Sequence, residues 1–246
     1  MTISVIIVCF NSGKTIGRAL ESIRKQVVLP DEVIIIDGGS LDNTLQVVQS
    51  FDDLTDILIS ESDTGIYNAM NKGLKLASGN IVGYLNSDDE FSSHDVIFKI
   101  KNAFNRNIGS KIFVSGVDYL ETNGSLSRSW RLESVQPFEL GWHPPHPGFY
   151  ARRSLLTRLG GFNEEFRIAA DFDLMLRSFE VTEINEIVVD HGKVVNMYLG
   201  GVSNASVRNV LKGNAEIRRS FANNGKQVTI IYTIKRIAKK FLDRWQ

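Results

Sequence analysis

Four apolar runs, rich in β-branched residues, recur in the first 86 positions and predict four buried strands. They are ISVIIVC (3–9), EVIIID ending at Asp37, DILIS (56–60) and NIVGYLN (80–86). Continuous apolar runs of this length are typical of strands that are buried on both faces, as in parallel sheets.

Apolar residues at helical spacing lie between these runs and predict connecting helices. They are Ile16, Leu20, Ile23 and Val27, then Leu45 and Val48, then Ile66, Met70, Gly73, Leu74 and Ala77. Strands that alternate with helices predict an α/β fold, with an open, mostly parallel sheet and helices on both faces.

The alternation weakens after about residue 110. The run 112–117 predicts a strand, the Asn123-Gly124 pair a hairpin turn, and residues 171–179 a helix. NEIVVD and VVNMYL predict two further strands on either side of His191-Gly192. Residues 136–150 are rich in proline, glycine and aromatics, which predicts an ordered irregular segment of the kind that often carries binding function.

Two helices are predicted at the C-terminus, over 203–222 and 226–245, so we divide the chain into a domain over 1–202 and a helical extension over 203–246. The net charge of zero conceals an asymmetry, because residues 208–246 contain ten Lys/Arg and two Asp/Glu. In 226–246, apolar residues alternate with basic ones, which is typical of a helix on an anionic membrane surface. The alternative is a helix packed on the domain with a solvated basic face.

Composition excludes several classes of protein. With 43% apolar residues and no net charge, the 246-residue chain is not expected to be disordered. A single cysteine, Cys9, excludes a disulfide framework and a cysteine-based zinc cluster. No apolar run approaches the roughly 18 residues that span a bilayer, and no basic segment of a signal peptide precedes the first strand. We therefore expect a cytoplasmic protein that does not bind nucleic acid.

Polar residues follow three of the predicted parallel strands. They are Asn11, Asp37 and the segment Asn86-Ser87-Asp88-Asp89. Ligands bind at the carboxyl ends of strands in open α/β sheets, so these residues are expected to line one crevice. Asp88 and Asp89 could hold Mg²⁺ or Mn²⁺ or could cap a helix. Asp37 could accept hydrogen bonds from a nucleoside or could bind its own turn.

Two further groups of residues could carry chemistry. Asp171 and Asp173 open a predicted helix, where a carboxylate either is stabilised by the helix dipole or acts as a general base. The aromatic and imidazole side chains of Trp130, Trp142, His143 and His146 could stack on a sugar acceptor or pack in the core.

Four blocks of this sequence, in this order, resemble family 2 glycosyltransferases with the GT-A fold. They are SVIIVCFNSGKTIGRALESIRKQ, EVIIIDGGSLDNT, ESDTGIYNAMNKGLKLASGNIVGYLNSDDEF and GGFNEEFRIAADFDLMLRS, and the resemblance covers roughly residues 2–180. The third block is especially similar to bacterial enzymes that build exopolysaccharide, colanic-acid-like or O-antigen chains.

The resemblance implies an inverting transfer of a sugar from a UDP- or GDP-sugar, helped by Mg²⁺ or Mn²⁺, to a saccharide or lipid-linked saccharide acceptor. By position it assigns Asp171 as the catalytic base and Asp88, then Asp89, as metal ligands. The donor would contact Phe10, Asn11, Asp37, Asp63, Asn71, Asn86 and Asp88, and Trp142, His143 and His146 are the weaker acceptor assignments. Cell-surface polysaccharide synthesis would place the enzyme at the inner face of the cytoplasmic membrane, with contact through 226–246.

The sequence departs from the family pattern at three positions: Gly38 stands where many relatives have a second acid, Met70 where many have arginine, and Asn86 at the first acid of the DxD metal motif. Two alternatives remain open. One is a sugar-nucleotide nucleotidyltransferase, whose glycine-rich basic loop is longer than Asn11-Ser12-Gly13-Lys14. The other is a non-catalytic nucleotide- or carbohydrate-binding relative.

Overall fold

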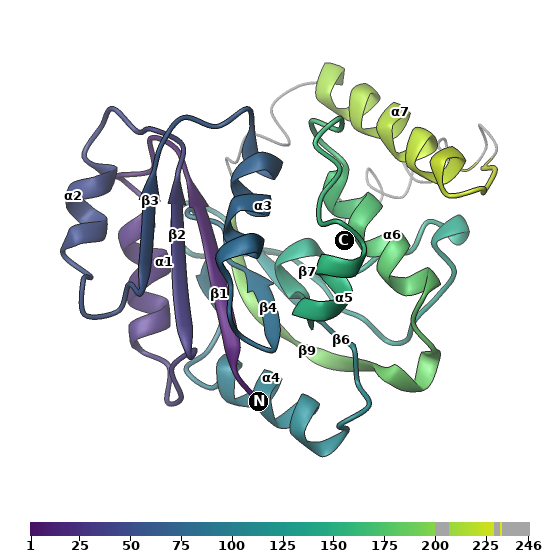
Figure 1. The fold of residues 1–246 in the computed structure, drawn as a ribbon, viewed down its shortest axis with the longest axis horizontal. Helices are drawn as coiled ribbons and strands as arrows, with labels where there is room; N and C mark the ends of the chain where they lie inside the picture. The colour runs from purple at the N-terminus through teal and green to yellow at the C-terminus, as the bar shows by residue number, and fades with distance from the viewer. Residues whose placement is uncertain (200–206, 229–231, 233–246) are drawn as a thin grey trace.

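The computed structural model describes residues 1–199, 207–228 and 232, which form a mixed sheet with helices on both faces (Figure 1). The strand order is β3-β2-β1-β4-β8-β6-β9-β5, and β7 pairs with β6. The first four strands in this order are parallel, which confirms the predicted α/β fold. They are β1 (Ile3–Cys9), β2 (Glu32–Asp37), β3 (Ile57–Ser60) and β4 (Ile81–Tyr84).

The second half of the sheet is mixed. β8 (Phe149–Arg152) runs antiparallel between β4 and β6 (Ile112–Leu120), while β6 and β9 (Ile187–Tyr198) are parallel. β5 (Glu90–Phe91) pairs antiparallel with β9, and β7 (Leu126–Trp130) forms the predicted hairpin with β6. These antiparallel pairs complete the α/β sheet beyond its parallel half.

One prediction about this half is wrong: the two strands expected around His191-Gly192 are a single strand, β9. The pairing shifts from Ser115↔Asp190 to Gly116↔Lys193, so His191 and Gly192 bulge out of the ladder without reversing the chain. A side chain on Gly116 would meet the carbonyl oxygens of Trp130 and, at 2.7 Å, of Gly192, which explains why a glycine lies opposite the bulge. Gly192 therefore lies in a bulge within one strand, where the sequence predicted a break between two strands.

Alternate residues of the central strands face two separate cores. Ile6, Val8 and Ile36 share one with α3 (Ile66–Leu76), α5 (Arg153–Arg158) and α6 (Ala170–Glu180). Ile3, Val5 and Ile7 share the other with α1 (Ile16–Arg24), α2 (Thr44–Gln49) and α4 (Val96–Arg106). Burial on both faces is why these strands lack a polar alternation.

The described part of the C-terminal extension consists of the helix α7 (Val207–Asn223), which packs on α6 (Figure 1), and of residues 224–228 and 232. The rings of Phe221 and Phe172 lie 5.4 Å apart across this contact, and Ile217 joins the same core. The second predicted helix, over 226–245, lies mostly outside the described residues. Among the described residues, no helix is both long and apolar enough to cross a membrane.

Three short 3₁₀ turns complete the described elements: η1 (Phe138–Leu140), η2 (His146–Gly148) and η3 (Ile184–Glu186). The first two lie within the proline-rich segment predicted to be ordered but irregular. That segment leads directly into β8, and therefore into the centre of the sheet.

Candidate functional site

The carboxyl ends of the parallel strands meet at one edge of the sheet, as the sequence predicted. Cys9 pairs with Asp37, and Asp37 with Ser60, so β1, β2 and β3 end in register. The hydroxyls of Ser12 and Ser87, 2.9 Å apart, link the loop after β1 to the loop after β4. The polar segments that follow three separate strands therefore lie together.

Asp37 is fully buried and its carboxylate is saturated with hydrogen bonds. It accepts bonds from the Gly39 and Ser40 amides at 3.2 and 3.0 Å, from the Ser60 hydroxyl at 2.7 Å and from the Ser40 hydroxyl. Burial alone would raise the pKa of Asp37, but these hydrogen bonds outweigh it and hold the pKa below its usual value. The geometry favours the interpretation that Asp37 shapes its own turn, and direct contact with a nucleoside stays a prediction.

Phe10 and Asp63 form the accessible part of this region. A side chain on Gly38 would meet Asp63 Oδ2 at 2.6 Å and the Phe10 ring at 3.4 Å, so both residues surround Gly38. The Phe10 ring is 60% exposed. Asp63 therefore fills the space beside Asp37 where many relatives are expected to carry a second acid. An exposed ring next to an accessible carboxylate suits a base and its sugar hydroxyls.

Asn11 lies at the border of this region and forms hydrogen bonds to the turn after β2. Its φ of 50° lies in the left-handed region, which asparagine tolerates better than most residues. Its side-chain oxygen accepts the Leu41 amide at 2.9 Å, and its own amide donates to the Ser40 hydroxyl at 2.7 Å. These bonds tie the turn after β1 to the turn after β2.

The two predicted metal ligands differ in their surroundings. Asp88 is partly exposed, whereas Asp89 is 2% exposed and accepts the Asn86 side-chain amide at 2.7 Å. Burial, and next the charge of Asp88, raise the pKa of Asp89 to about 7. Asp88 is thus the carboxylate that is open to a cation. Among the described residues, no cluster of three or more His, Cys, Asp or Glu could hold a metal alone. One carboxylate that shares a cation with substrate phosphates fits this arrangement.

The two acids that open α6 have separate surroundings as well. Asp173 is buried, forms an ion pair with Arg177 at 2.8 Å and accepts the Ser220 hydroxyl of α7 at 2.7 Å. Asp171 is partly exposed, and the Tyr67 hydroxyl lies 3.3 Å from its Oδ1. Asp173 therefore joins α6 to α7, and Asp171 is the one available for proton transfer.

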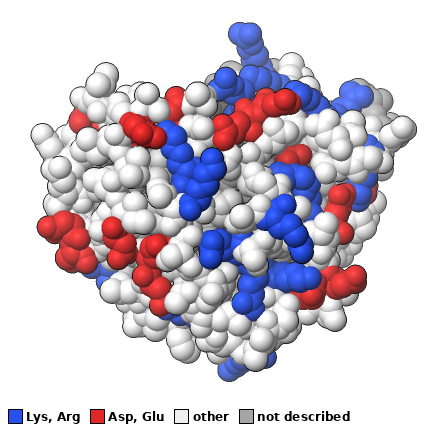
Figure 2. Space-filling model, in the orientation of Figure 1, with Lys and Arg blue, Asp and Glu red and all other residues white. Residues whose placement is uncertain are grey.

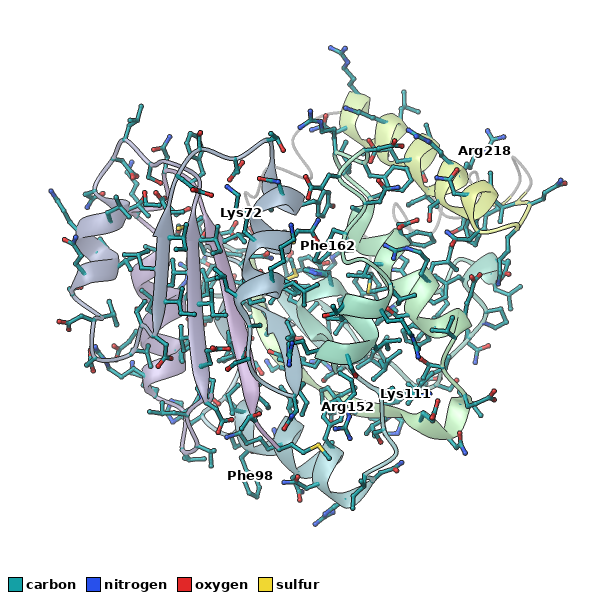
Figure 3. All side chains as sticks on the ribbon, in the orientation of Figure 1. Lys72, Phe98, Lys111, Arg152, Phe162 and Arg218 are labelled. Carbon is teal, nitrogen blue, oxygen red and sulfur yellow. The ribbon has the colours of Figure 1, made fainter. Side chains whose placement is uncertain are left out.

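An aromatic cluster joins the end of β4 to Asp171. Phe162 lies between α3 and α6 (Figure 3), with its ring 5.3 Å from Tyr84 and 5.5 Å from Tyr67. The His146 ring packs on Tyr84 and Phe162, and its Nε2 is buried without a hydrogen-bond partner among the described residues. Burial lowers the pKa of His146, while the negative charge of Asp171 opposes this shift. His146 and Asp171 both border this cluster, His146 through Tyr84 and Phe162 and Asp171 through the Tyr67 hydroxyl.

The remaining predicted contacts have structural roles in the described chain. The Trp142 ring packs edge-on against Phe138 and Phe179, and His143 packs between Trp130 and Phe172. The Asn71 side chain is buried and donates to the Phe162 carbonyl at 2.9 Å and to Glu164 at 2.7 Å. Acceptor binding by Trp142, His143 and His146 stays a prediction, as does donor binding by Asn71.

Sequence reasoning missed two residues that shape this region. Tyr67 contacts Asp171, and the Arg18 guanidinium donates to the Asp88 carbonyl while lying 3.6 Å from the centre of the Tyr198 ring. Tyr67 lies in the third resembling block, but only the fold shows that its hydroxyl reaches α6.

Comparison with known proteins agrees with the fold. The family model described as Glycosyl transferase family 2 matches residues 4–164, more than half of the chain. The chain belongs to glycosyl transferase family 2. A PGL/p-HBAD biosynthesis glycosyltransferase of Mycobacterium bovis is 29% identical over 211 residues, which cover 83% of this chain and 80% of that protein.

Solved glycosyltransferases share the GT-A fold of this chain. S. aureus TarS 1–349 in complex with UDP-GlcNAc matches with a TM-score of 0.67 and 21% identity, over 99% of this chain and 72% of that one. The mannosyltransferase PcManGT from Pyrobaculum calidifontis, in complex with GDP-Man and Mn²⁺, matches with a TM-score of 0.62 and 17% identity. The match covers 98% of this chain and 69% of that one.

Replacing Asp89 by asparagine tests the assignment of its raised pKa. The folded chain holds the Asp89 proton more tightly than the unfolded chain, so folding stability falls as pH rises from the unfolded pKa of 3.8 to about 7. Asp89→Asn removes this loss. In EDTA at pH 8 we expect the melting temperature of the variant to exceed that of the wild type by several degrees, since about 1 kcal/mol shifts Tm by roughly 2–4 °C in a protein of this size. At pH 4.5 we expect a much smaller difference.

The exposed Asp52→Asn is the control for this measurement, since it should show no such trend. A difference between Asp89→Asn and wild type that is the same at both pH values would contradict the assignment.

Proposed function

We propose that this family 2 glycosyltransferase inverts the configuration of a sugar as it moves it from a nucleotide-diphosphate donor to a saccharide or lipid-linked saccharide acceptor. The observation that carries the proposal is the exposure and hydrogen bonding of the Asp171 carboxylate. It is a partly exposed carboxylate at the start of α6, and the Tyr67 hydroxyl is its hydrogen-bond partner among the described residues. It lies next to the aromatic cluster that borders the end of β4.

A single general base is sufficient for this reaction. Asp171 takes the proton of the acceptor hydroxyl as that oxygen bonds to the anomeric carbon. The bond from this carbon to the phosphate oxygen breaks on the opposite side, and its electron pair leaves with the nucleoside diphosphate. One such in-line displacement inverts the anomeric configuration without a covalent intermediate. Retaining glycosidases, by contrast, need a second carboxylate as nucleophile.

The donor nucleoside would lie against Phe10 and Asp63, beside the turn that Asp37 holds. The complexes of TarS with UDP-GlcNAc and of PcManGT with GDP-Man support a nucleotide sugar as donor. Asn11 and Ser40 join the two turns on which this pocket would stand. A rigid pocket of this kind orients the donor before the acceptor arrives.

Mg²⁺ or Mn²⁺ fits beside Asp88, the one open carboxylate of the segment after β4. The Mn²⁺ in the PcManGT complex supports a divalent ion in this fold. Such an ion, shared between Asp88 and the donor phosphates, would neutralise the charge of the leaving diphosphate. Asn86 would support this metal site indirectly, because its side-chain amide donates a hydrogen bond to Asp89 and holds that side chain in place.

The exposed face of α7 supports a role at the cytoplasmic face of an anionic membrane, in cell-surface polysaccharide synthesis. Lys and Arg side chains follow α7 along one border of the molecule in Figure 2, and Arg218 extends from it in Figure 3. Arg208, Lys212 and Arg218 are exposed, whereas the acid of this helix, Glu216, is buried. Together with the basic residues of 235–244, this face would attract anionic lipid headgroups, whereas Lys226 forms ion pairs with Glu139 and Glu180 of the domain.

Replacing Asp171 by asparagine removes the proposed base but keeps the size of the side chain. We expect transfer to fall by roughly 10²- to 10⁴-fold, the usual contribution of a general base. Donor binding should stay within twofold of wild type, because the donor pocket is built from other elements. Release of UDP or GDP from the corresponding sugar nucleotides measures the rate. Asp52→Asn is the control, and near-normal turnover of Asp171→Asn would refute the assignment.

Replacing Asp88 by alanine tests the metal ligand. Calorimetric titration of UDP and GDP, with Mn²⁺ and with EDTA, separates metal-dependent from metal-independent binding. For the variant we expect at least tenfold weaker binding in Mn²⁺ and unchanged binding in EDTA, because a carboxylate–cation contact is lost. Binding that responds to Mn²⁺ as in the wild type would count against Asp88.

Charge reversal on α7 tests the membrane surface. The full chain should sediment with vesicles that contain phosphatidylglycerol, and the triple variant Arg208→Glu, Lys212→Glu, Arg218→Glu should bind at least tenfold more weakly. Each basic residue near an anionic surface contributes about 1 kcal/mol. Reversal of the exposed Lys25, which follows α1, and of the exposed Lys99 and Arg106 on α4 is the matched control. Equal binding by the two triple variants would remove α7 from the membrane contact.

A further inference from the structure

Glu216 of α7 reaches the chain segment that leads into α6. Its side chain is buried and accepts hydrogen bonds from three consecutive backbone amides. Glu216 Oε2 lies 2.8 Å from the Ile168 nitrogen and 2.9 Å from the Ala169 nitrogen, and the Arg167 nitrogen lies 3.1 Å from Oε1. One carboxylate thus binds the three residues that immediately precede α6.

This contact lies at the N-terminus of α6, which has no side-chain cap of its own. Ala169 is the residue at the N-cap of α6, and it has no side chain that could accept a hydrogen bond. Backbone N–H groups near a helix start lack partners within the helix, and a negative charge near the positive end of the helix dipole is favourable. Glu216 supplies both the acceptor and the charge from a helix almost 50 residues away in the sequence.

The bound segment also fixes the surroundings of Asp171. The Ile168 carbonyl accepts the Tyr67 hydroxyl at 2.8 Å, and the same hydroxyl lies 3.3 Å from Asp171 Oδ1. On the other side of Asp171, α7 holds Phe172 through the Phe221 ring and Asp173 through the Ser220 hydroxyl. Contacts from α7 therefore bracket Asp171 before and after it in the sequence.

We propose that Glu216 is a positioning residue for the catalytic carboxylate of Asp171. It holds residues 167–169 so that α6 begins with Asp171 directed toward the acceptor hydroxyl. This inference rests on the proposed function, in which Asp171 is the base. It makes α7 part of the catalytic unit, although the matched family region ends at residue 164.

Two substitutions remove this contact, one in part and one completely. Glu216→Gln keeps one oxygen for Ile168 and Ala169 but directs an NH₂ group at the Arg167 amide, and Glu216→Ala removes every bond. We expect kcat to fall a few-fold in the first variant and roughly 10- to 100-fold in the second, since small displacements of a reacting group cost about this much. KM for the donor should stay within twofold. The assay measures UDP released from UDP-GlcNAc, or GDP from GDP-mannose, in Mn²⁺.

Two controls separate positioning from general loss of stability. Glu165→Gln breaks the exposed ion pair with Arg219, which joins the same loop to the same helix without touching 167–169. Phe104→Leu removes core volume in α4, on the opposite face of the sheet, and lowers the melting temperature. Both controls should keep kcat within twofold of wild type.

Three results would overturn the proposal. One is a kcat of Glu216→Ala within twofold of wild type. The second is a loss that Phe104→Leu reproduces at an equal drop in melting temperature, and the third is a rise in KM with kcat unchanged.

Hydrogen exchange distinguishes failure of this inference from failure of the proposed function. The amides of 167–169 should exchange at least tenfold faster in Glu216→Gln than in wild type, whether or not either nucleotide sugar is turned over. If wild type releases neither nucleotide, this counts against the proposed function, while the exchange difference still supports the hold of Glu216 on the segment. Equal exchange in the two proteins overturns the positioning role.

Discussion

Burial of carboxylates is the constraint on which the rest of this structure depends. A charge removed from water is tolerated only where hydrogen bonds or opposite charges replace its hydration. Asp37, Asp173 and Glu216 meet this requirement with hydroxyl and amide donors or an arginine. Asp37 fixes the backbone of a turn, Glu216 fixes the segment before α6, and Asp173 joins α6 to α7. Asp63, Asp88 and Asp171 lie beside them and stay accessible. The chain thus builds this region with one set of acids and leaves another set accessible.

The fold supports this division because the parallel strands end in register. The register of β1, β2 and β3 places the turns after β1 and β2 next to each other. The aromatic cluster of Tyr84, Phe162, Tyr67 and His146 then connects the end of β4 to α6. Because α7 holds α6 and also exposes a basic face, an anionic surface bound by α7 would lie next to the helix that carries Asp171.

Much of the fold was predictable from the sequence, and the family resemblance assigned roles to individual acids, whereas the contacts of those acids were not predictable. The four parallel strands and the helices between them follow from apolar runs and periodicity. The single bulged strand β9 was missed, because a glycine at a bulge has the same local sequence signal as one at a turn. The choice between Asp171 and Asp173 depends on Ser220, 47 residues from Asp173, which no local pattern contains. Likewise, Ser60 binds Asp37 across 23 residues.

The account is tested most directly by a crystal structure of the full chain with Mn²⁺ and an unreactive analogue of the nucleotide sugar that it binds. Anomalous scattering would locate the ion. We expect the ion to lie at a bonding distance of about 2.1 Å from an Asp88 oxygen and from the donor phosphates, with the carboxylate of Asp171 facing the anomeric carbon from the side opposite the leaving group. An ion bound elsewhere, or an Asp171 carboxylate directed away from that carbon, would contradict the account.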